Sequence, residues 1–161
     1  IRLKGRKLMG AEQYITQEAI KGGGLFEAGS FILATTATIG EHAFLIADSL
    51  ANQQFTNLKI RESLTRKLTT DFFFYYLFVV DDYCKDITNT STFQAVSMEK
   101  LKKFITLVPS LSEQRAIADY LDRKCAEIDE LIVIKQQKIE ALKEYKKSVI
   151  FEYVTGKKEV L

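Results

Sequence analysis

The sequence is poor in the side chains that build metal centres and disulfide scaffolds. Its 161 residues include two cysteines, Cys84 and Cys125, far apart in the chain, and a single histidine, His42. A structural zinc site needs about four nitrogen or sulfur ligands, so a self-contained zinc site is close to excluded. Two distant cysteines also argue against a disulfide-stapled secreted protein. We therefore expect a cytoplasmic protein without a metal or another cofactor.

Long apolar runs and a strong excess of one charge are missing as well. The longest apolar run covers only residues 72–80, far short of the roughly 20 that cross a bilayer, so we expect no membrane partner. Lys and Arg together number 23 against 21 Asp and Glu, which excludes a histone-like cationic protein but not a local basic patch. Apolar residues make up 47% of the chain, enough for a folded core.

Proline occurs once, and Pro109 separates two regions with different patterns. Before it, glycine-rich turns separate short runs that favour β-strands. The aromatic run after Asp71 predicts a buried helix over about 71–83. The adjacent carboxylates of Asp81 and Asp82 are expected to end it. A central strand is the alternative, because aromatic residues favour sheets. The predicted strands cover residues 1–4, 30–34, 42–47, 55–60 and 104–108. This pattern predicts a small mixed α/β domain over residues 1–109.

No glycine or proline interrupts residues 112–154, which predicts a long helix within a region that we place at 110–156, before a tail at 157–161. Ser112 is the expected N-cap, and a capping box formed by Ser110 and Glu113 is the alternative. A break near residues 122–125 stays open. The predicted fold class is therefore α+β, a small domain followed by a long C-terminal helix.

Apolar residues recur at spacings of three and four along this helix. At roughly 1.5–3 kcal/mol for each large apolar side chain that is buried, such a stripe is costly to expose. We expect it to be covered by a second copy, another part of a longer chain, or a partner protein. The residues expected to pair are Ile117, Leu121, Ile128, Leu131, Ile132, Ile139, Leu142, Tyr145 and Val149.

No combination of residues indicates catalysis. His42 lies in a β-type run and is predicted to be a half-buried strand residue, and Gly22-Gly23-Gly24 lacks the spacing of a phosphate-binding loop. Basic residues do cluster, at positions 2–7, 59–61 and 66–67, and such clusters can neutralise phosphate groups; a plain solvated surface is the alternative. We therefore expect a non-catalytic protein.

The segment Pro109–Leu121, with the sequence PSLSEQRAIADYL, resembles the P-x-L-x-E-Q-x-x-I-A-x-x-L segment in the DNA specificity subunits of type I restriction-modification enzymes. The continuation at 128–131, 138–145 and 154–156 is similar too. Upstream, ATIG at 37–40 and NQQF at 52–55 resemble framework pieces of the target recognition domain of that family.

The resemblance implies a target recognition domain, lacking its N-terminal part, followed by a conserved spacer helix. In the family, two such domains each read half of a split site on double-stranded DNA, and two long antiparallel helices hold them apart. The subunit docks methyltransferase subunits and, through them, the restriction subunit. This chain has one domain and one helix, and it begins with Ile1 rather than Met. It is therefore expected to be the C-terminal part of a longer subunit or a half-subunit that pairs with itself as a homodimer through the helix.

The two framework tetrads are shared by members with different targets, so we expect structural or backbone roles there, although Gln53 and Gln54 can pair with adenine. The candidate DNA-binding residues are Arg6, Lys7, Lys21, Gln53, Gln54, Lys59, Arg61, Arg66, Lys67, Ser91 and Thr92. The alternative function is a coiled-coil assembly module with a protein-binding globular head.

Overall fold

A computed structural model describes residues 7, 8, 10, 14, 16, 20, 24–89 and 95–160, which form two compact units, Ile1–Ala118 and Asp119–Leu161. The predicted strand over 1–4 and the candidate DNA-binding residues Arg6, Lys21, Ser91 and Thr92 lie outside the described residues. The glycine run at 22–24 is described only at Gly24.

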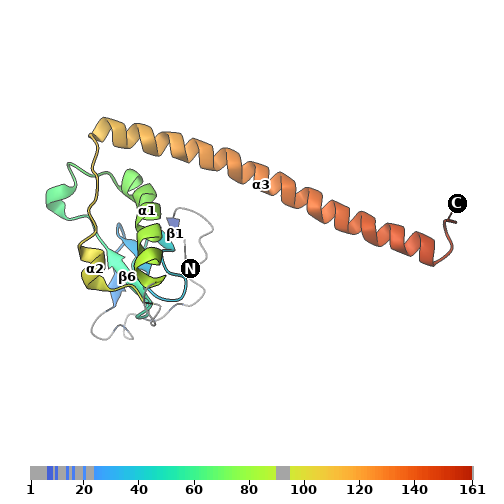
Figure 1. The fold of residues 1–161 in the computed structure, drawn as a ribbon, viewed down its shortest axis with the longest axis horizontal. Coiled ribbons are helices and arrows are strands. Elements are labelled where there is room, and N and C mark those ends of the chain that lie inside the picture. Colours follow the sequence, from blue (N-terminus) through green and yellow to red (C-terminus); the bar gives the residue numbers. More distant parts are fainter. Residues whose placement is uncertain are drawn as a thin grey trace. The chain divides into compact units, whose positions relative to one another are not determined.

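A four-stranded sheet forms the centre of the first unit (Figure 1). In spatial order its strands are β1 (Lys7–Leu8), β4 (His42–Leu45), β3 (Phe31–Ala34) and β6 (Phe55–Leu58). β3 runs antiparallel to both β4 and β6, and β1 runs parallel to β4. Two shorter strands, β2 (Leu25–Phe26) and β5 (Ser49–Leu50), pair antiparallel in a second sheet. The strands predicted over 30–34, 42–47 and 55–60 are thus confirmed, with shorter bounds.

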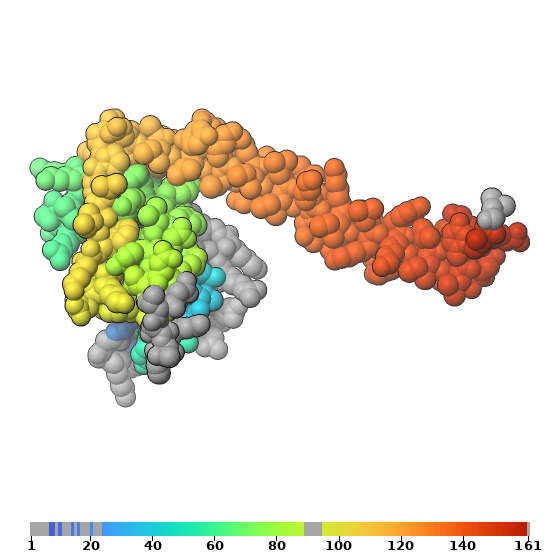
Figure 2. All heavy atoms as spheres, viewed as in Figure 1, coloured from blue at the N-terminus to red at the C-terminus, as the bar shows by residue number. Residues whose placement is uncertain are grey.

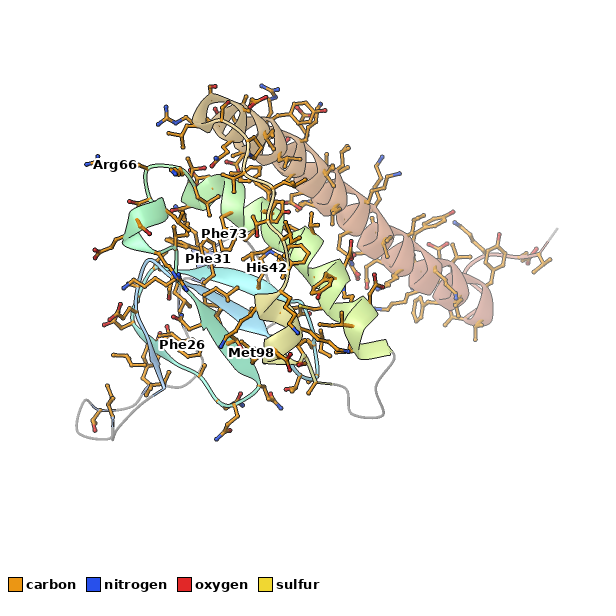
Figure 3. The ribbon with its side chains drawn as sticks, turned by 60° about the vertical axis from the view of Figure 1, so that its left-hand side comes forward. Phe26, Phe31, His42, Arg66, Phe73 and Met98 are labelled. Atoms are coloured by element: carbon orange, nitrogen blue, oxygen red, sulfur yellow. The ribbon has the colours of Figure 1, made fainter. Side chains whose placement is uncertain are left out.

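Helix α1 (Thr70–Asn89) covers one face of the larger sheet (Figure 1). Phe31 and Leu33 point from β3 toward Leu77 and Phe74 of the helix, and the rings of Phe31 and Phe73 meet edge to face at 5.3 Å (Figure 3). Ile32 points to the other face, so that every residue of β3 is buried. The predicted helix is confirmed over the strand alternative.

The predicted end of that helix is wrong. Asp81 and Asp82 lie inside α1, which continues to Asn89. Asp81 Oδ2 accepts from the Lys85 ammonium one turn further on, at 2.5 Å, so this charge is paired within the helix and does not end it; Oδ1 is buried without a hydrogen-bond partner among the described residues.

The connection from α1 to the C-terminal helix contains the short helix α2 (Met98–Lys102), capped by Ser97. The strand predicted over 104–108 does not form. The backbone N–H of Leu107 donates to the Tyr76 hydroxyl at 3.0 Å instead of to a neighbouring strand, and the Ile105 side chain is 82% exposed. Exposed apolar residues without a strand partner are not held in a sheet.

The C-terminal helix α3 (Leu111–Val154) is unbroken, so the possible break near 122–125 does not form. Ser110, not Ser112, caps it. The Ser110 N–H donates to the Glu113 carboxylate at 3.0 Å and the Glu113 N–H donates to Ser110 Oγ at 3.4 Å, which is the alternative capping box. Gly156, with φ of +71°, follows the last turn, where glycine is favoured.

Only Gln114 and Ala118 of α3 are buried. In the second unit, the predicted pairing residues are exposed or partly exposed: 54% for Ile128, 58% for Leu131, 65% for Leu142. The fold class is α+β with a long C-terminal helix, as predicted. Among the described residues, none of the helices has both the length and the apolar content that crossing a bilayer requires.

Candidate nucleic-acid interface

The connection from β6 to α1, residues 59–69, carries four of the candidate DNA-binding residues and is called the basic loop here. Lys59, Arg61, Arg66 and Lys67 are all exposed. In Figure 2 the loop stands out as a lobe on the surface of the first unit, and in Figure 3 Arg66 points away from the sheet. The sequence predicted the charge cluster, and the structure brings its members onto one loop.

Local hydrogen bonds keep the basic loop compact. A 3₁₀ turn, η2 (Glu62–Leu64), begins after Arg61, whose carbonyl accepts from the Leu64 N–H at 2.8 Å. The Leu64 carbonyl in turn accepts from the N–H groups of Lys67 and Leu68 at 2.8 and 2.9 Å. Leu68 is buried, so the loop returns to the core directly after its last cation. A loop held in this way presents its cations with little backbone entropy left to lose on binding.

The four cations of the loop differ in their electrostatic surroundings. The Lys59 ammonium donates to the Glu27 carboxylate, and this pair raises the pKa of Lys59. Within the described part of the chain, no ion pair engages Arg61, Arg66 or Lys67. These three charges are therefore available to an anionic partner, whereas a phosphate at Lys59 would compete with Glu27.

Lys7 is not part of this cluster. It is exposed on β1, one edge strand of the sheet, whereas the basic loop follows β6 at the opposite edge. The sequence grouped Lys7 with Arg2, Lys4 and Arg6, which lie outside the described residues.

Gln53 and Gln54 lie in the turn before β6, so the whole strand separates them from the basic loop, by about 13 Å at the usual rise of a strand. Both side chains are exposed. The backbone of this turn has a structural role, because the Gln54 N–H donates to Asn52 Oδ1 at 3.0 Å and the Gln54 carbonyl accepts from the Thr35 N–H at 2.8 Å. The turn therefore holds β3 and β6 in register while the two amide side chains point to solvent.

The second framework tetrad, residues 37–40, forms the turn between β3 and β4 at the same end of the sheet. Ala37 has a φ of +57°, and Gly40 has a φ of +90°. A Cβ on Gly40 would lie 1.4 Å from Asp81 Oδ1, so only glycine allows this approach of the turn to α1. Thr35, which the sequence did not single out, holds the 52–55 turn against the end of β3, because its N–H and its Oγ1 both donate to the Gln54 carbonyl, at 2.8 and 3.2 Å. No pattern in the sequence identifies it.

Two buried ionisable groups of the described residues, His42 and Cys84, lie outside the basic loop. His42 lies in β4, a strand as predicted, but it is fully buried rather than half-buried, with its ring centroid 5.2 and 4.5 Å from those of Phe74 and Phe78. Desolvation lowers its pKa, while the hydrogen bond to the Gly40 carbonyl and the charge of Asp81 act in the opposite direction. Burial raises the pKa of Cys84 to about 11, which makes its thiol unreactive. Among the described residues, no group of three or more His, Cys, Asp or Glu side chains could hold a metal ion.

Comparison with known proteins connects this architecture to one family. The family model described as the type I restriction modification DNA specificity domain matches residues 11–144, most of the chain. The chain belongs to the type I restriction-modification DNA specificity family. The match includes the turn tetrads, the basic loop and most of α3, so a single family model spans both the domain before Pro109 and the helix after it.

Two curated members of the specificity family are similar in sequence. The chain is 40% identical over 130 residues to the type I restriction enzyme EcoprrI specificity subunit of Escherichia coli, covering 76% of this chain and 32% of that one. It is 32% identical over 136 residues to the type I restriction enzyme MjaIX specificity subunit of Methanocaldococcus jannaschii, covering 81% and 29%. The chain thus spans about a third of the length of these relatives.

A solved structure shares the fold. It is a chain from work on the structural basis of complex assembly and conformational transition of the type I R-M system, and it superposes with a TM-score of 0.69 at 19% identity. The match covers 81% of this chain and 31% of that one.

Proposed function

We propose that this chain reads DNA for a type I restriction-modification system and has no catalytic role itself. Its head, residues 1–109, would recognise half of a split target on double-stranded DNA. Its helical region, residues 110–156, would pair with a second helix, and residues 157–161 form a tail. Methyltransferase subunits, and through them the restriction subunit, are the proposed protein partners. The observation that carries the proposal is the exposed basic loop on a head that leads directly into a long helix with an apolar stripe.

Charge and chemistry divide the proposed contacts into two groups. Arg61, Arg66 and Lys67 have no acidic partner within the described residues and are proposed to contact phosphate groups. Gln53 and Gln54 present amides that can pair with adenine edges in the major groove. The further proposed contacts are Arg6, Lys7, Lys21, Lys59, Ser91 and Thr92.

The stripe of α3 supports pairing with a second copy. An antiparallel pair brings the head of each chain to opposite ends of a rod, the arrangement that a split target requires. Three lysines interrupt the stripe, and if the pair is centred at position 133, each of them faces an apolar residue of the other helix. These pairs are Lys124–Leu142, Lys135–Leu131 and Lys138–Ile128. A lysine stem can cover such a residue while the ammonium reaches water, so no two ammonium groups meet in the seam.

Two identical heads on a twofold axis make a specific prediction about the target. Each head reads the same half-site, so the preferred DNA should be an inverted repeat with a gap of fixed length. Selection from a random duplex library by the chain together with its methyltransferase subunit tests this. An interrupted inverted repeat supports the proposal. Failure to enrich any motif would overturn it and favour the protein-assembly alternative.

A further inference from the structure

Gln114 is unusual among the residues of α3 because it is fully buried. Its exposed fraction is 0%, and only Ala118, one turn further on the same face, is also buried. A primary amide has two donor hydrogens and an acceptor oxygen, and burial makes each of them costly to leave unbonded. The bonds that Gln114 makes are therefore informative about its role.

The carboxamide of Gln114 is bonded to three backbone groups in two segments, the end of the basic loop and Pro109. Its Oε1 accepts from the Thr69 N–H at 2.8 Å, and its Nε2 donates to the Lys67 carbonyl at 2.7 Å and to the Pro109 carbonyl at 2.8 Å. A backbone N–H can only donate and a carbonyl can only accept, so the orientation of the amide is fixed. Leucine would leave all three groups unbonded, and glutamate would direct a carboxylate at two carbonyl oxygens.

These three backbone groups lie where the basic loop, α1 and α3 meet. Lys67 is the last cation of the basic loop, and its side chain stays exposed while Gln114 holds its backbone. Thr69 precedes α1, and its Oγ1 accepts from the Phe72 N–H at 3.3 Å as the helix cap. Pro109 leads into α3. One side chain thus ties the basic loop to the start of the C-terminal helix.

The neighbouring residue Glu113 has a different role in the same turn. It is exposed and bonds Ser110 in the capping box, which lowers the pKa of its carboxyl. The Glu-Gln dipeptide therefore fixes the first turn of α3 from both sides: Glu113 closes the cap facing solvent, and Gln114 docks the turn on the head. The small side chain of Ala118 lets the next turn approach closely.

We propose that Gln114 is a positioning residue that couples the phosphate-binding loop to the first turns of α3. It touches no DNA. It holds Lys67, and with it Arg66, at a fixed place relative to the start of the helix that is proposed to set the distance between half-sites. This inference rests on the proposed function. According to this inference, Gln114 affects which gap length between half-sites the protein prefers, and does not affect which bases it reads.

The test measures binding to a series of duplexes that carry two constant half-sites and a gap that varies by one base pair at a time. The unaltered chain is used first, with its methyltransferase subunit, to find the preferred gap. The Gln114→Leu variant should keep the same half-site motif but lose about tenfold of its preference for that gap, the scale of a lost hydrogen-bond network. Where Gln114→Leu does not fold, Gln114→Asn, which keeps the amide on a shorter stem, replaces it in the comparison.

A matched control separates positioning from general destabilisation. Cys84→Ala removes a buried core group of α1 far from the loop–helix junction in sequence, and it should lower stability without changing the gap preference. If the unaltered chain selects an inverted repeat and the Gln114 variant keeps its gap preference within about twofold, the inference is wrong while the proposed function stands. If the unaltered chain selects no motif, the proposed function fails, and the inference fails with it.

Discussion

The head and the second unit reach their stability in opposite ways. In the head, residues far apart in sequence close a core in which Phe31, Leu33 and Leu77 are completely buried. In α3, no residue after Ala118 is buried, although Ile128, Leu131 and Leu142 are as apolar as core residues. A long helix in water gains little from propensity alone and depends on packing of its apolar face. The difference teaches that the described part of the head closes a core with its own residues, whereas α3 leaves its apolar face exposed, the feature on which the proposed pairing depends.

The strongest way to break this comparison is to place charge on the stripe of α3. Ile128→Lys together with Leu142→Lys should abolish pairing, because each change forfeits roughly 1.5–3 kcal/mol of apolar burial and places an ammonium opposite Lys138 or Lys124 of the other helix in the proposed register. Light scattering at tens of micromolar should then give the monomer mass, with the melting of the head unchanged.

The chain offers a control at matched exposure. Val133 is 55% exposed against 54% for Ile128, but it lies off the stripe, so Val133→Lys should leave the pair intact. If both variants gave the monomer mass, or both kept the mass of the pair, the stripe would not be the interface.

Gly40→Ala tests the packing of the head instead. The new Cβ would overlap the Asp81 carboxylate, and alanine is strained at the φ of Gly40, so we expect a loss of about 2–4 kcal/mol in the free energy of unfolding. Chemical denaturation measures it. Gly29→Ala has a similar φ, +82°, but no neighbour within 4 Å, and should cost only the backbone strain of about 1–2 kcal/mol. Similar losses at both positions would contradict the close approach of the turn to α1.

Removing one cation from the basic loop should have a moderate effect on DNA binding. Arg66→Ala should weaken binding to any duplex and reduce the salt slope by about 0.9, the value for one phosphate contact. Lys59→Ala should change the slope less, because Glu27 already neutralises Lys59. If Arg66→Ala leaves the salt dependence of binding unchanged, Arg66 does not contact a phosphate group.

The smallest expected effect concerns His42 and pH. Its pKa is lowered in the folded head by burial, so the unfolded chain takes up a proton first as the pH falls below the ordinary value of about 6.5. Stability should therefore fall as the pH drops from about 7.5 to about 5, and His42→Gln should reduce that fall. Thermal melts of both proteins across this range measure it. An identical pH dependence would show that the proton uptake of His42 does not differ between the two states.

Much of this architecture follows from local patterns. The long helix, the aromatic helix and the strands around 31–34, 42–45 and 55–58 could be predicted because each depends on its own residues. The end of α1 could not, because the pairing of Asp81 with Lys85 competes with the signal of two adjacent carboxylates. The strand predicted over 104–108 failed because a strand needs a neighbour, which a single segment does not encode.

The sequence identifies the candidate basic residues, but it does not show which clusters share one surface. Adjacent cations at 59–67 fall on one loop because they are close in sequence, whereas Lys7 lies on the other edge of the sheet. Gln114 was visible in the segment that carries the family resemblance, but its burial and its backbone partners at Lys67 and Thr69 depend on contacts between segments far apart in sequence. Such contacts require the fold.

Disulfide trapping tests the proposed antiparallel pairing of α3 most directly. Leu131→Cys and Lys135→Cys are made separately with Cys125→Ser, because Cys125 is exposed, and are then oxidised alone and as a mixture. In an antiparallel pair centred at 133, position 131 of one helix faces position 135 of the other, within the reach of about 7 Å that a disulfide needs between Cα atoms. We predict a covalent dimer in the mixture and none with either variant alone. A dimer of Leu131→Cys by itself, or no dimer in the mixture, would contradict antiparallel pairing at this register.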